Sequence, residues 1–222
     1  MNFLSRLVLF FTPSVVIIAL GAFVWFCHSL NPWALLLFLG AIYGLPLITY
    51  RFHQLAFPLK EGISYINNKE ISHWWISSQL QSLYFTFPVL ETVLRLIPGL
   101  FSFWLRLWGA KIGKGVYWTP QIAIADRGLI EVGDNVMFGN WVVLVPHAVK
   151  PRKGQLMLYI KKISIGERTF VGGSSRLGPG VHIEKESIIP VNSDIYPNQK
   201  INQIEDDQEG KDEIDSQKLT EK

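Results

Sequence analysis

Aliphatic residues recur at every sixth position through the second half of this 222-residue chain. The position after each is often glycine, and the fourth position beyond is small or β-branched. Neither a helical period of 3.6 nor a strand period of 2 produces a strict spacing of six, so the pattern indicates an internal repeat. The aliphatic positions are Ile165, Val171, Leu177, Ile183, Ile189 and Ile195, with companion small positions at Thr169, Ser175, Val181, Ser187 and Ser193.

The same spacing appears upstream in two separate runs, first Ile112, Trp118 and Ile124 and then Val132, Phe138 and Leu144. A triangular solenoid explains it, because one branched side chain in six points into a narrow core and stacks on its counterpart in the next coil. The glycine or polar residue that follows is expected to tolerate the corner backbone. The repeat therefore predicts a mainly β protein in which residues 109–200 form a left-handed parallel β-helix.

Residues 149–164 break this rhythm, and Lys150 stands where an aliphatic residue is expected. Loops on rigid scaffolds often carry binding and catalytic groups, so this excursion from the solenoid is a candidate functional region.

The first 53 residues hold two uncharged apolar runs, at positions 7–27 and 33–50. Roughly 20 apolar residues cross a bilayer, and only a tight turn separates the two runs. The pattern predicts a transmembrane helical hairpin. Arg6 precedes the first run, Arg51 and Lys60 follow the second, and the turn has no Lys or Arg, so both ends are expected in the cytoplasm. The protein is expected to be integral to a membrane such as a bacterial inner membrane.

Residues 54–108 form the next predicted unit, an amphipathic helical linker rich in aromatic residues and interrupted by Pro88 and Pro98. Prolines favour several short helices over one span. Trp and Arg together are typical of helices that lie in the membrane interface. An apolar helical cap on the β-helix explains the same composition, and both interpretations stay open.

Charge is divided unevenly along the chain. Residues 201–222 carry eight acidic residues and three lysines, a net charge of −5. Since the whole chain has a net charge of +3, the first 200 residues carry +8. The tail is expected to be disordered. The basic body suits an anionic lipid surface or a phosphorylated substrate, whereas its scattered cations do not favour nucleic acid. The single cysteine, Cys27, excludes a disulfide within the chain.

The segment ISIGERTFVGGSSRLGPGVHI (163–183), with the pairs Ile112-Gly113 and Val132-Gly133, resembles the hexapeptide-repeat acyltransferases. The stretch LVPHAVKPRKGQLMLYIKKISIG (144–166) is also similar to the solenoid region of nonribosomal-synthetase-like proteins. The first resemblance implies a homotrimer that binds acyl-CoA between neighbouring solenoids, as a donor substrate and not as a permanent cofactor. It also implies that His147 is the general base on an acceptor hydroxyl.

An imidazole suits that role near neutral pH. Many relatives place an acidic residue after this histidine, whereas this chain has Ala148 and Val149. The partner that orients His147 is therefore unidentified, and a backbone carbonyl is one candidate. His182 lies inside the repeat and is interpreted as a solvated residue.

Further site residues follow from the resemblance. Glycines let a backbone approach the pantetheine arm of CoA, although simple corner formation explains each of them too. Basic side chains could meet the CoA phosphates, or only be solvated. Asn140 is a candidate for orienting the acceptor. The predicted CoA-binding residues are Gly172, Gly173, Ser174, Arg176, Gly178, Gly180, Lys161 and Lys162.

Other chemistries find no support in the sequence. The repeats hold only two histidines, and no closely spaced His or Cys set predicts a metal site. P-loop, G-x-G-x-x-G and G-x-S-x-G motifs are absent. The leading hypothesis is an acyl-CoA-dependent O-acyltransferase, with acetyl as the expected group, that acts on a hydroxyl of a membrane-proximal or lipid-linked acceptor such as a glycan. The alternative is a non-catalytic membrane scaffold or accessory subunit.

Overall fold

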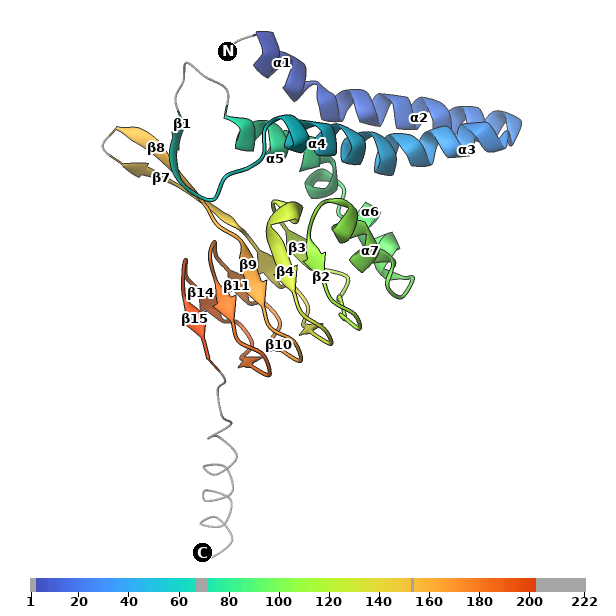
Figure 1. The fold of residues 1–222 in the computed structure, drawn as a ribbon. Coiled ribbons are helices and arrows are strands. Elements are labelled where there is room, and N and C mark those ends of the chain that lie inside the picture. Colours follow the sequence, from blue (N-terminus) through green and yellow to red (C-terminus); the bar gives the residue numbers. More distant parts are fainter. Residues whose placement is uncertain (1–2, 67–71, 153, 203–222) are drawn as a thin grey trace, which may run out of the picture.

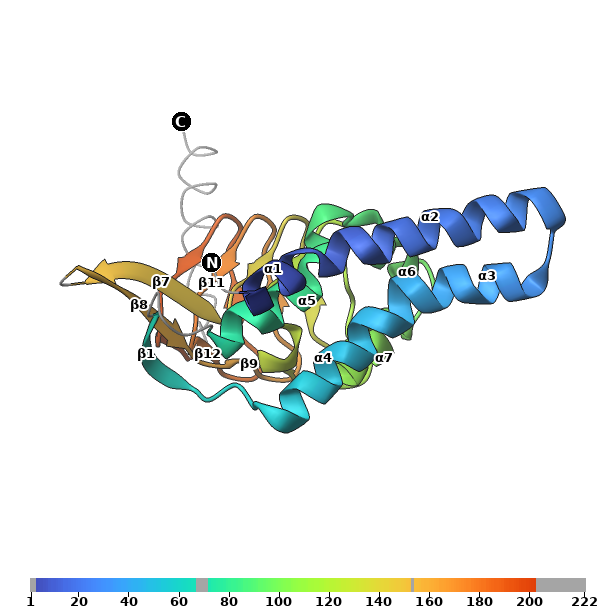
Figure 2. The same cartoon turned by 90° about the horizontal axis from the view of Figure 1, so that it is seen from above.

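The computed structural model describes residues 3–66, 72–152 and 154–202. A helical hairpin projects beyond one end of a β-helix, and a two-stranded arm projects beyond the other (Figures 1 and 2). The predicted acidic tail lies, from residue 203 onward, outside the described residues.

The N-terminal helices are almost wholly apolar. They are α1 (Phe3–Leu9), α2 (Phe11–Ser29), α3 (Pro32–Leu39), the π-helix η1 (Gly40–Gly44) and α4 (Leu45–Ala56). Leu30 adopts a left-handed conformation at the turn, and the Asn31 side chain accepts a hydrogen bond from Trp33 N at the start of α3. By length and composition, 11–29 and 32–56 could each cross a membrane. Only 17% and 28% of their most apolar windows are buried, unlike the core helices of a soluble protein.

Three further helices follow: α5 (His73–Thr86), α6 (Val89–Arg95) and α7 (Leu100–Leu107). Phe101 of α7 packs edge-on against Trp118, which stacks on Phe138 inside the β-helix at 4.7 Å between ring centroids. Trp108, just after α7, packs on Tyr50 of α4. These helices therefore share one apolar core with the β-helix, as the cap interpretation predicts.

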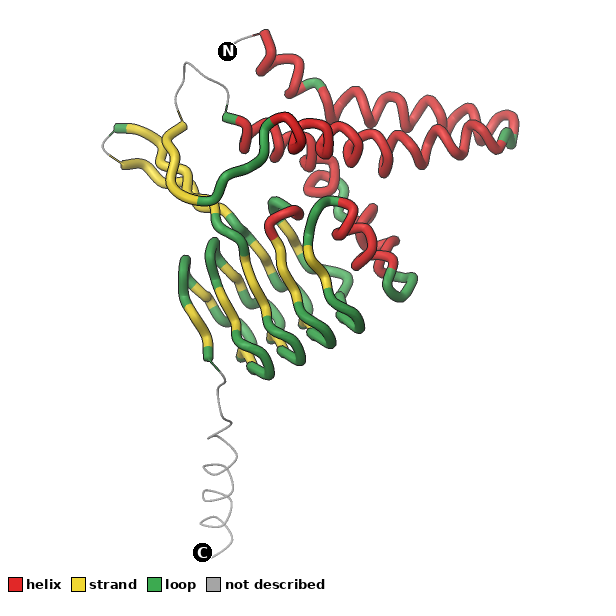
Figure 3. The backbone as a smooth tube through the Cα atoms, in the orientation of Figure 1, coloured by secondary structure: helices red, strands yellow, loops and turns green. Residues whose placement is uncertain are grey.

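The β-helix has three faces of short parallel strands with turns at the corners (Figure 3). The first face holds β2 (Lys111–Ile112), β4 (Ile130–Val132), β9 (Ile163–Ile165), β12 (His182–Ile183) and β15 (Lys200–Ile201). The second holds β3 (Ala123–Ile124), β6 (Val143–Leu144), β11 (Arg176–Leu177) and β14 (Asp194–Ile195). The third holds β5 (Met137–Phe138), β10 (Phe170–Val171) and β13 (Ile188–Ile189).

The six-residue spacing sets the stacking. Leu144 pairs with Leu177, which pairs with Ile195. The other two faces repeat this arrangement with aliphatic residues and, on the third face, Phe138. All the predicted aliphatic positions are at most 8% exposed. The three-sided parallel β-helix is thereby confirmed, while its left-handed sense stays a prediction. Ile201 pairs with Ile183, so the described β-helix continues one residue beyond the expected boundary at residue 200.

The explanation given for the corner glycines is wrong. The residue directly after each aliphatic position does not adopt positive φ. In most coils the residue three places after the aliphatic position does, as at Asn135 (56°) and Arg168 (54°). Gly133 is needed for close approach instead: a Cβ there would lie 2.6 Å from the backbone nitrogen of Glu167 in the next coil. Glycine is therefore required at this position because the adjacent coils stack too closely for a side chain.

The predicted excursion is an antiparallel hairpin, β7 (His147–Arg152) and β8 (Gln155–Ile160). A third strand, β1 (Gly62–Ile66), pairs with β8 and ties the arm to the N-terminal half (Figure 1). The prediction of a helical linker over 54–108 is wrong for this segment. β-Branched and aromatic residues give it strand propensity, and the open edge of β8 supplies its partner.

Candidate active site

His147 and Asp126 form the centre of the candidate site. His147 begins β7 at the point where the chain leaves the β-helix, and its Nδ1 lies 2.5 Å from Asp126 Oδ2. The Asp126 side chain is 2% exposed and the His147 side chain 24%. A carboxylate can only accept, so Nδ1 carries the hydrogen and donates it; in the neutral imidazole the lone pair is then on Nε2, where it can take a proton.

This finding corrects the expected orienting partner. The sequence leaves this partner unidentified, with a backbone carbonyl as one candidate, and the structure places the buried carboxylate of Asp126 there. Asp126 comes two residues after Ile124, and Ile124 pairs with Leu144 in the next coil. The stacking of two coils therefore brings the two side chains together, although 21 positions separate them along the chain.

Asp126 is held in place by the helical cap. Its φ of 43° is left-handed, and it precedes the 3₁₀ turn η2 (Arg127–Leu129). The next residue, Arg127, is 1% exposed and donates from Nε to Glu91 Oε1 of α6 at 2.6 Å. Gln81 Oε1 of α5 accepts from both Arg127 N and Arg127 Nη1, at 3.0 and 3.2 Å. Two helices outside the repeats thus hold Arg127, and through it the turn that carries Asp126.

Trp74 of α5 contacts the other side of the imidazole. Its ring centroid lies 4.7 Å from that of His147, with the planes 60° apart. Ile160 of β8 is paired with His147 across the hairpin. The histidine is therefore enclosed by the arm and by α5, neither of which belongs to the repeats.

Some predicted donor residues lie at the same corner of the β-helix as His147. Lys161 N donates to Pro146 O at 3.0 Å, and Gly180 N donates to Lys161 O at 3.2 Å. Gly178 begins this turn, where its nitrogen donates to Ile195 O at 2.9 Å. Backbone hydrogen bonds thus connect the histidine corner with Lys161, Gly178 and Gly180.

Asn140, Gly172, Gly173 and Ser174 gather at a different corner. Ser174 N donates to Asn140 O at 2.7 Å, and Gly139 N donates to Val171 O at 2.8 Å, next to Gly172. The second face, with β6 and β11, lies between this corner and that of His147. The structure therefore does not bring Asn140 into contact with the His147–Asp126 pair.

The predicted cations already have partners within the chain. Arg176 donates to both carboxylate oxygens of Asp194, at 2.6 and 2.7 Å. Lys161 Nζ lies 3.0 Å from Asn198 Oδ1, and Lys162 Nζ lies 3.1 Å from Glu131 Oε1. Burial alone would raise the pKa of Glu131, but hydrogen bonds from Lys111 and Lys162 outweigh it and lower that pKa. His182 is exposed and contacts Glu184, as its solvated interpretation predicts.

Sequence reasoning missed Asp126 and Trp74. The coil register carries a signal for Asp126, because pairing Ile124 with Leu144 sets the residues that follow them side by side. Trp74 has no such signal, since its contact depends on how α5 folds back. Among the described residues, no group of three or more His, Cys, Asp or Glu side chains could hold a metal ion.

Comparison with known proteins yields two curated relatives, while no protein-family model matches. The delta-poly-L-ornithine synthetase of Acinetobacter baumannii (strain AB307-0294) is 26% identical over 123 residues, covering 53% of this chain and 9% of that protein. The galactoside O-acetyltransferase of Lactococcus lactis subsp. lactis (strain IL1403) is 36% identical over 85 residues, covering 36% of this chain and 41% of that protein. The chain thus spans less than half the length of either relative.

Solved structures give weaker likenesses. A hexapeptide-repeat acetyltransferase of Vibrio cholerae O1 biovar eltor, complexed with acetyl coenzyme A, matches with a TM-score of 0.36 and 20% identity over 42% of this chain and 55% of that one. A galactoside acetyltransferase in complex with coenzyme A matches with a TM-score of 0.33 and 16% identity over 51% and 74%. Part of this chain is thus similar to a galactoside O-acetyltransferase, and the resemblance to hexapeptide-repeat acyltransferases predicted from the repeats is confirmed.

Proposed function

We propose that the protein is an acyl-CoA-dependent O-acyltransferase, with acetyl as the transferred group. The observation that carries this proposal is the His147–Asp126 pair, set where the chain leaves a hexapeptide β-helix. A paired, partly exposed imidazole is suited to general-base chemistry. The sequence similarity to an O-acetyltransferase supports the same reaction class.

The proposed reaction is a direct transfer. His147 Nε2 takes the proton of the acceptor hydroxyl while its oxygen attacks the thioester carbonyl carbon. The tetrahedral intermediate collapses as the carbon–sulfur bond breaks, and the CoA thiolate leaves with the proton from the imidazolium. Asp126 keeps the hydrogen on Nδ1 and stabilises the imidazolium through its buried negative charge.

The donor would lie along the second face of the β-helix, between the two corners that hold the predicted glycines. Lys161, Lys162 and Arg176 would exchange their present partners for CoA phosphates. A homotrimer would complete the donor groove with a neighbouring β-helix, as the resemblance implies. The mass of the detergent-solubilised protein by light scattering tests this assembly.

The acceptor is proposed to be membrane-proximal or lipid-linked, such as a glycan. The apolar helices 11–29 and 32–56 support this proposal, because together they would hold the site beside the bilayer. With both ends of the hairpin in the cytoplasm, the catalytic domain would meet cytosolic acyl-CoA.

Release of free CoA tests the activity directly. The purified full chain in detergent would be given acetyl-CoA and a panel of hydroxyl acceptors, and the thiol would be titrated. His147→Ala is expected to lower the acceptor-dependent rate by roughly 10²–10⁴-fold. His182→Ala is the matched control, because His182 is an exposed histidine of the same β-helix. Equal rates for the native protein and His147→Ala would refute the assignment of the base.

A non-catalytic scaffold is the second candidate. It is favoured by the internal pairing of Arg176 with Asp194 and of Lys162 with Glu131, which occupies cations that the donor would need. Calorimetry with CoA separates the two functions: saturable binding supports the transferase, and no heat of binding supports the scaffold.

A further inference from the structure

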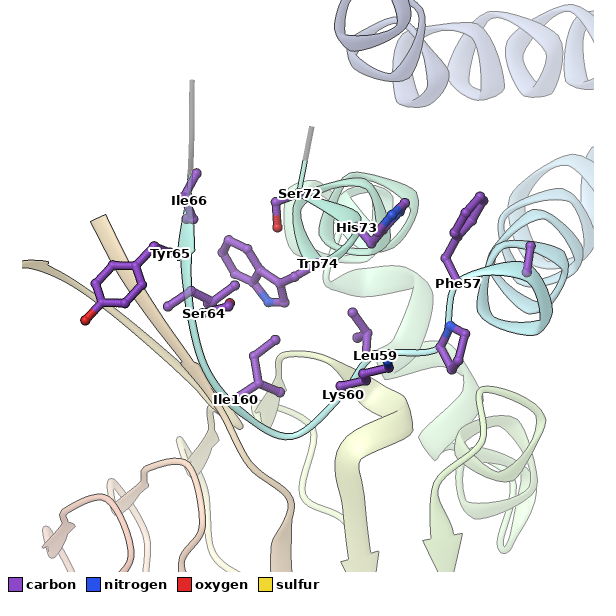
Figure 4. A pocket seen from close by; sticks show the side chains of 13 residues that line it. Phe57, Leu59, Lys60, Ser64, Tyr65, Ile66, Ser72, His73, Trp74 and Ile160 are labelled. Atoms are coloured by element: carbon purple, nitrogen blue, oxygen red, sulfur yellow. The ribbon is translucent and has the colours of Figure 1, made fainter. Parts of the chain in front are cut away.

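A cavity of about 550 Å³ lies outside the β-helix, beside the candidate site. Its walls are the end of α4, strand β1, the start of α5 and strand β8 (Figure 4). Ligand pockets typically measure about 300–1,000 Å³, so this one is large enough for a small molecule or a lipid chain.

The cavity adjoins His147 through two residues that line it. Trp74 projects from α5 into the cavity (Figure 4), and its ring also packs against the imidazole, 4.7 Å away between centroids. Ile160, in the opposite wall, is the strand partner of His147. A molecule held in the cavity would therefore have one end next to the histidine.

The cavity wall formed by β8 is apolar. Leu158 and Ile160 are at most 4% exposed, and Leu59, Ile66 and Trp74 pack against them. One polar atom interrupts this wall: Trp74 Nε1 is buried and has no hydrogen-bond partner among the described residues. A buried donor without an acceptor is unfavourable, so an oxygen atom of the ligand would complete it.

The cavity begins where the second apolar helix ends. Ala56, the last residue of α4 and of the 32–56 helix, lines it, and Phe57 and Pro58 follow directly in the wall. An alkyl chain leaving a bilayer along this helix would meet Ala56, Phe57 and Pro58 first, and the exposed Lys60 further along the same wall could face its polar end. This position favours an amphiphile over a free sugar or nucleotide.

We infer that this cavity binds the apolar chain of a hydroxyl-bearing amphiphile, which is the acyl acceptor. The chain lies against Leu158, Ile160 and Trp74, an oxygen near its polar end accepts from Trp74 Nε1, and the hydroxyl reaches His147 Nε2. This inference rests on the proposed transferase function for the acceptor role, but the binding of an alkyl chain is measurable without turnover.

Photolabelling tests the binding. The native full chain in lipid nanodiscs would be irradiated with a long-chain alcohol that carries a diazirine on its alkyl chain, and the labelled peptides would be mapped by mass spectrometry. Saturable labelling of β1, α5 or β8, removed by excess unlabelled long-chain alcohol but not by ethanol, is expected. Labelling confined to lipid-facing positions of 11–29 and 32–56 would overturn the inference.

Two variants sharpen the test. Ser64→Trp fills the cavity from β1 and is expected to weaken labelling by roughly tenfold or more, whereas Ile63→Trp, one residue earlier and outside the cavity lining, is the matched control. Trp74→Phe removes the N–H and is expected to weaken binding of the alcohol but not of the corresponding alkane probe. Native-like labelling in Ser64→Trp would refute the site.

Turnover separates this inference from the proposed function. If CoA release depends on His147 for short alcohols but does not improve with alkyl length, the transferase stands and the amphiphile site falls. If the cavity is labelled but no alcohol supports CoA release, the binding site stands and the acceptor role falls. Both are supported if the KM is lower for long-chain than for short-chain alcohols, and if Ser64→Trp raises the KM for long-chain alcohols while Ile63→Trp does not.

Discussion

The chemistry of the candidate site depends on one hydrogen bond between distant residues. The pairing of His147 Nδ1 with the 2%-exposed Asp126 side chain fixes which imidazole nitrogen has the free lone pair. A hydroxyl group is a poor nucleophile until a base removes its proton, so the tautomer decides whether the site can act. The sequence identifies the histidine, and the fold supplies the carboxylate.

Asp126→Asn tests this role while keeping the backbone. Asparagine tolerates the left-handed conformation of residue 126 (φ 43°) about as well as aspartate does. Its NH₂ group can donate to Nδ1 and so move the hydrogen to Nε2. The rate of CoA release is expected to fall on the order of 10²–10⁴-fold, with the calorimetric affinity for CoA unchanged. A variant with native activity would remove Asp126 from the mechanism.

Gly133→Ala tests how tightly the coils stack. The added Cβ would lie 2.6 Å from a backbone nitrogen, which cannot turn aside as a side chain could. The free energy of unfolding is expected to fall by about 1–3 kcal/mol, measured by thermal denaturation in detergent. Gly21→Ala is the control, since nothing lies within 4 Å of its added Cβ. A native melting temperature for Gly133→Ala would contradict the close-approach explanation.

At the scale of elements, the helical cap controls the site as much as the β-helix does. α5 supplies both Gln81, which holds Arg127, and Trp74, which touches His147. α6 supplies Glu91, and β1 closes the arm. A β-helix without these elements would keep His147 but lose the contacts that enclose it.

Glu91→Gln tests this coupling. Both Glu91 and Arg127 are at most 4% exposed, so the variant leaves a buried guanidinium without its counter-charge. The free energy of unfolding is expected to fall by about 3–5 kcal/mol, followed by circular dichroism on heating. The rate of CoA release should fall too, because Arg127 directly follows Asp126.

Glu131→Gln provides the comparison for that variant. Glu131 pairs with Lys111 and Lys162 on a half-exposed surface, where an ion pair contributes less than about 1 kcal/mol. If Glu91→Gln and Glu131→Gln destabilised the protein equally, the buried Arg127–Glu91 contact would not be what holds the Asp126 turn.

At the scale of the whole molecule, the hairpin and the β-helix are parts of one packed structure. Tyr50 of α4 and Trp108 beside α7 connect them, and the hairpin projects past the end of the β-helix in both views (Figures 1 and 2). This arrangement would fix the height of the candidate site above a bilayer.

Membrane topology tests the proposed location. In a Cys27→Ser background, Asn31→Cys places the only thiol in the hairpin turn. In intact cells, a membrane-impermeant maleimide is expected to label this variant from outside. A matched Lys200→Cys variant in the β-helix is expected to react only after lysis. The reverse pattern would invert the orientation, and extraction of the protein by alkaline carbonate without detergent would refute membrane insertion.

The sequence by itself determined the β-helix, the position of His147 and the presence of an interruption, which was expected at residues 149–164 and lies at 147–160, because residues 163–165 already pair in the β-helix as β9. Each of these features follows from the spacing of residues along a short stretch of sequence, because every coil needs an apolar core residue six positions after the last one. The two apolar helices are equally local, since length and hydropathy define them.

Only the tertiary structure decided what surrounds His147. Asp126 reaches it by coil stacking, Trp74 by the folding back of α5, and β1 by pairing with the arm. These contacts join segments far apart in the chain, and none follows from a period within one segment. Their geometry is set by how the helical cap packs on the first coils, which depends on the shared core and not on any local pattern.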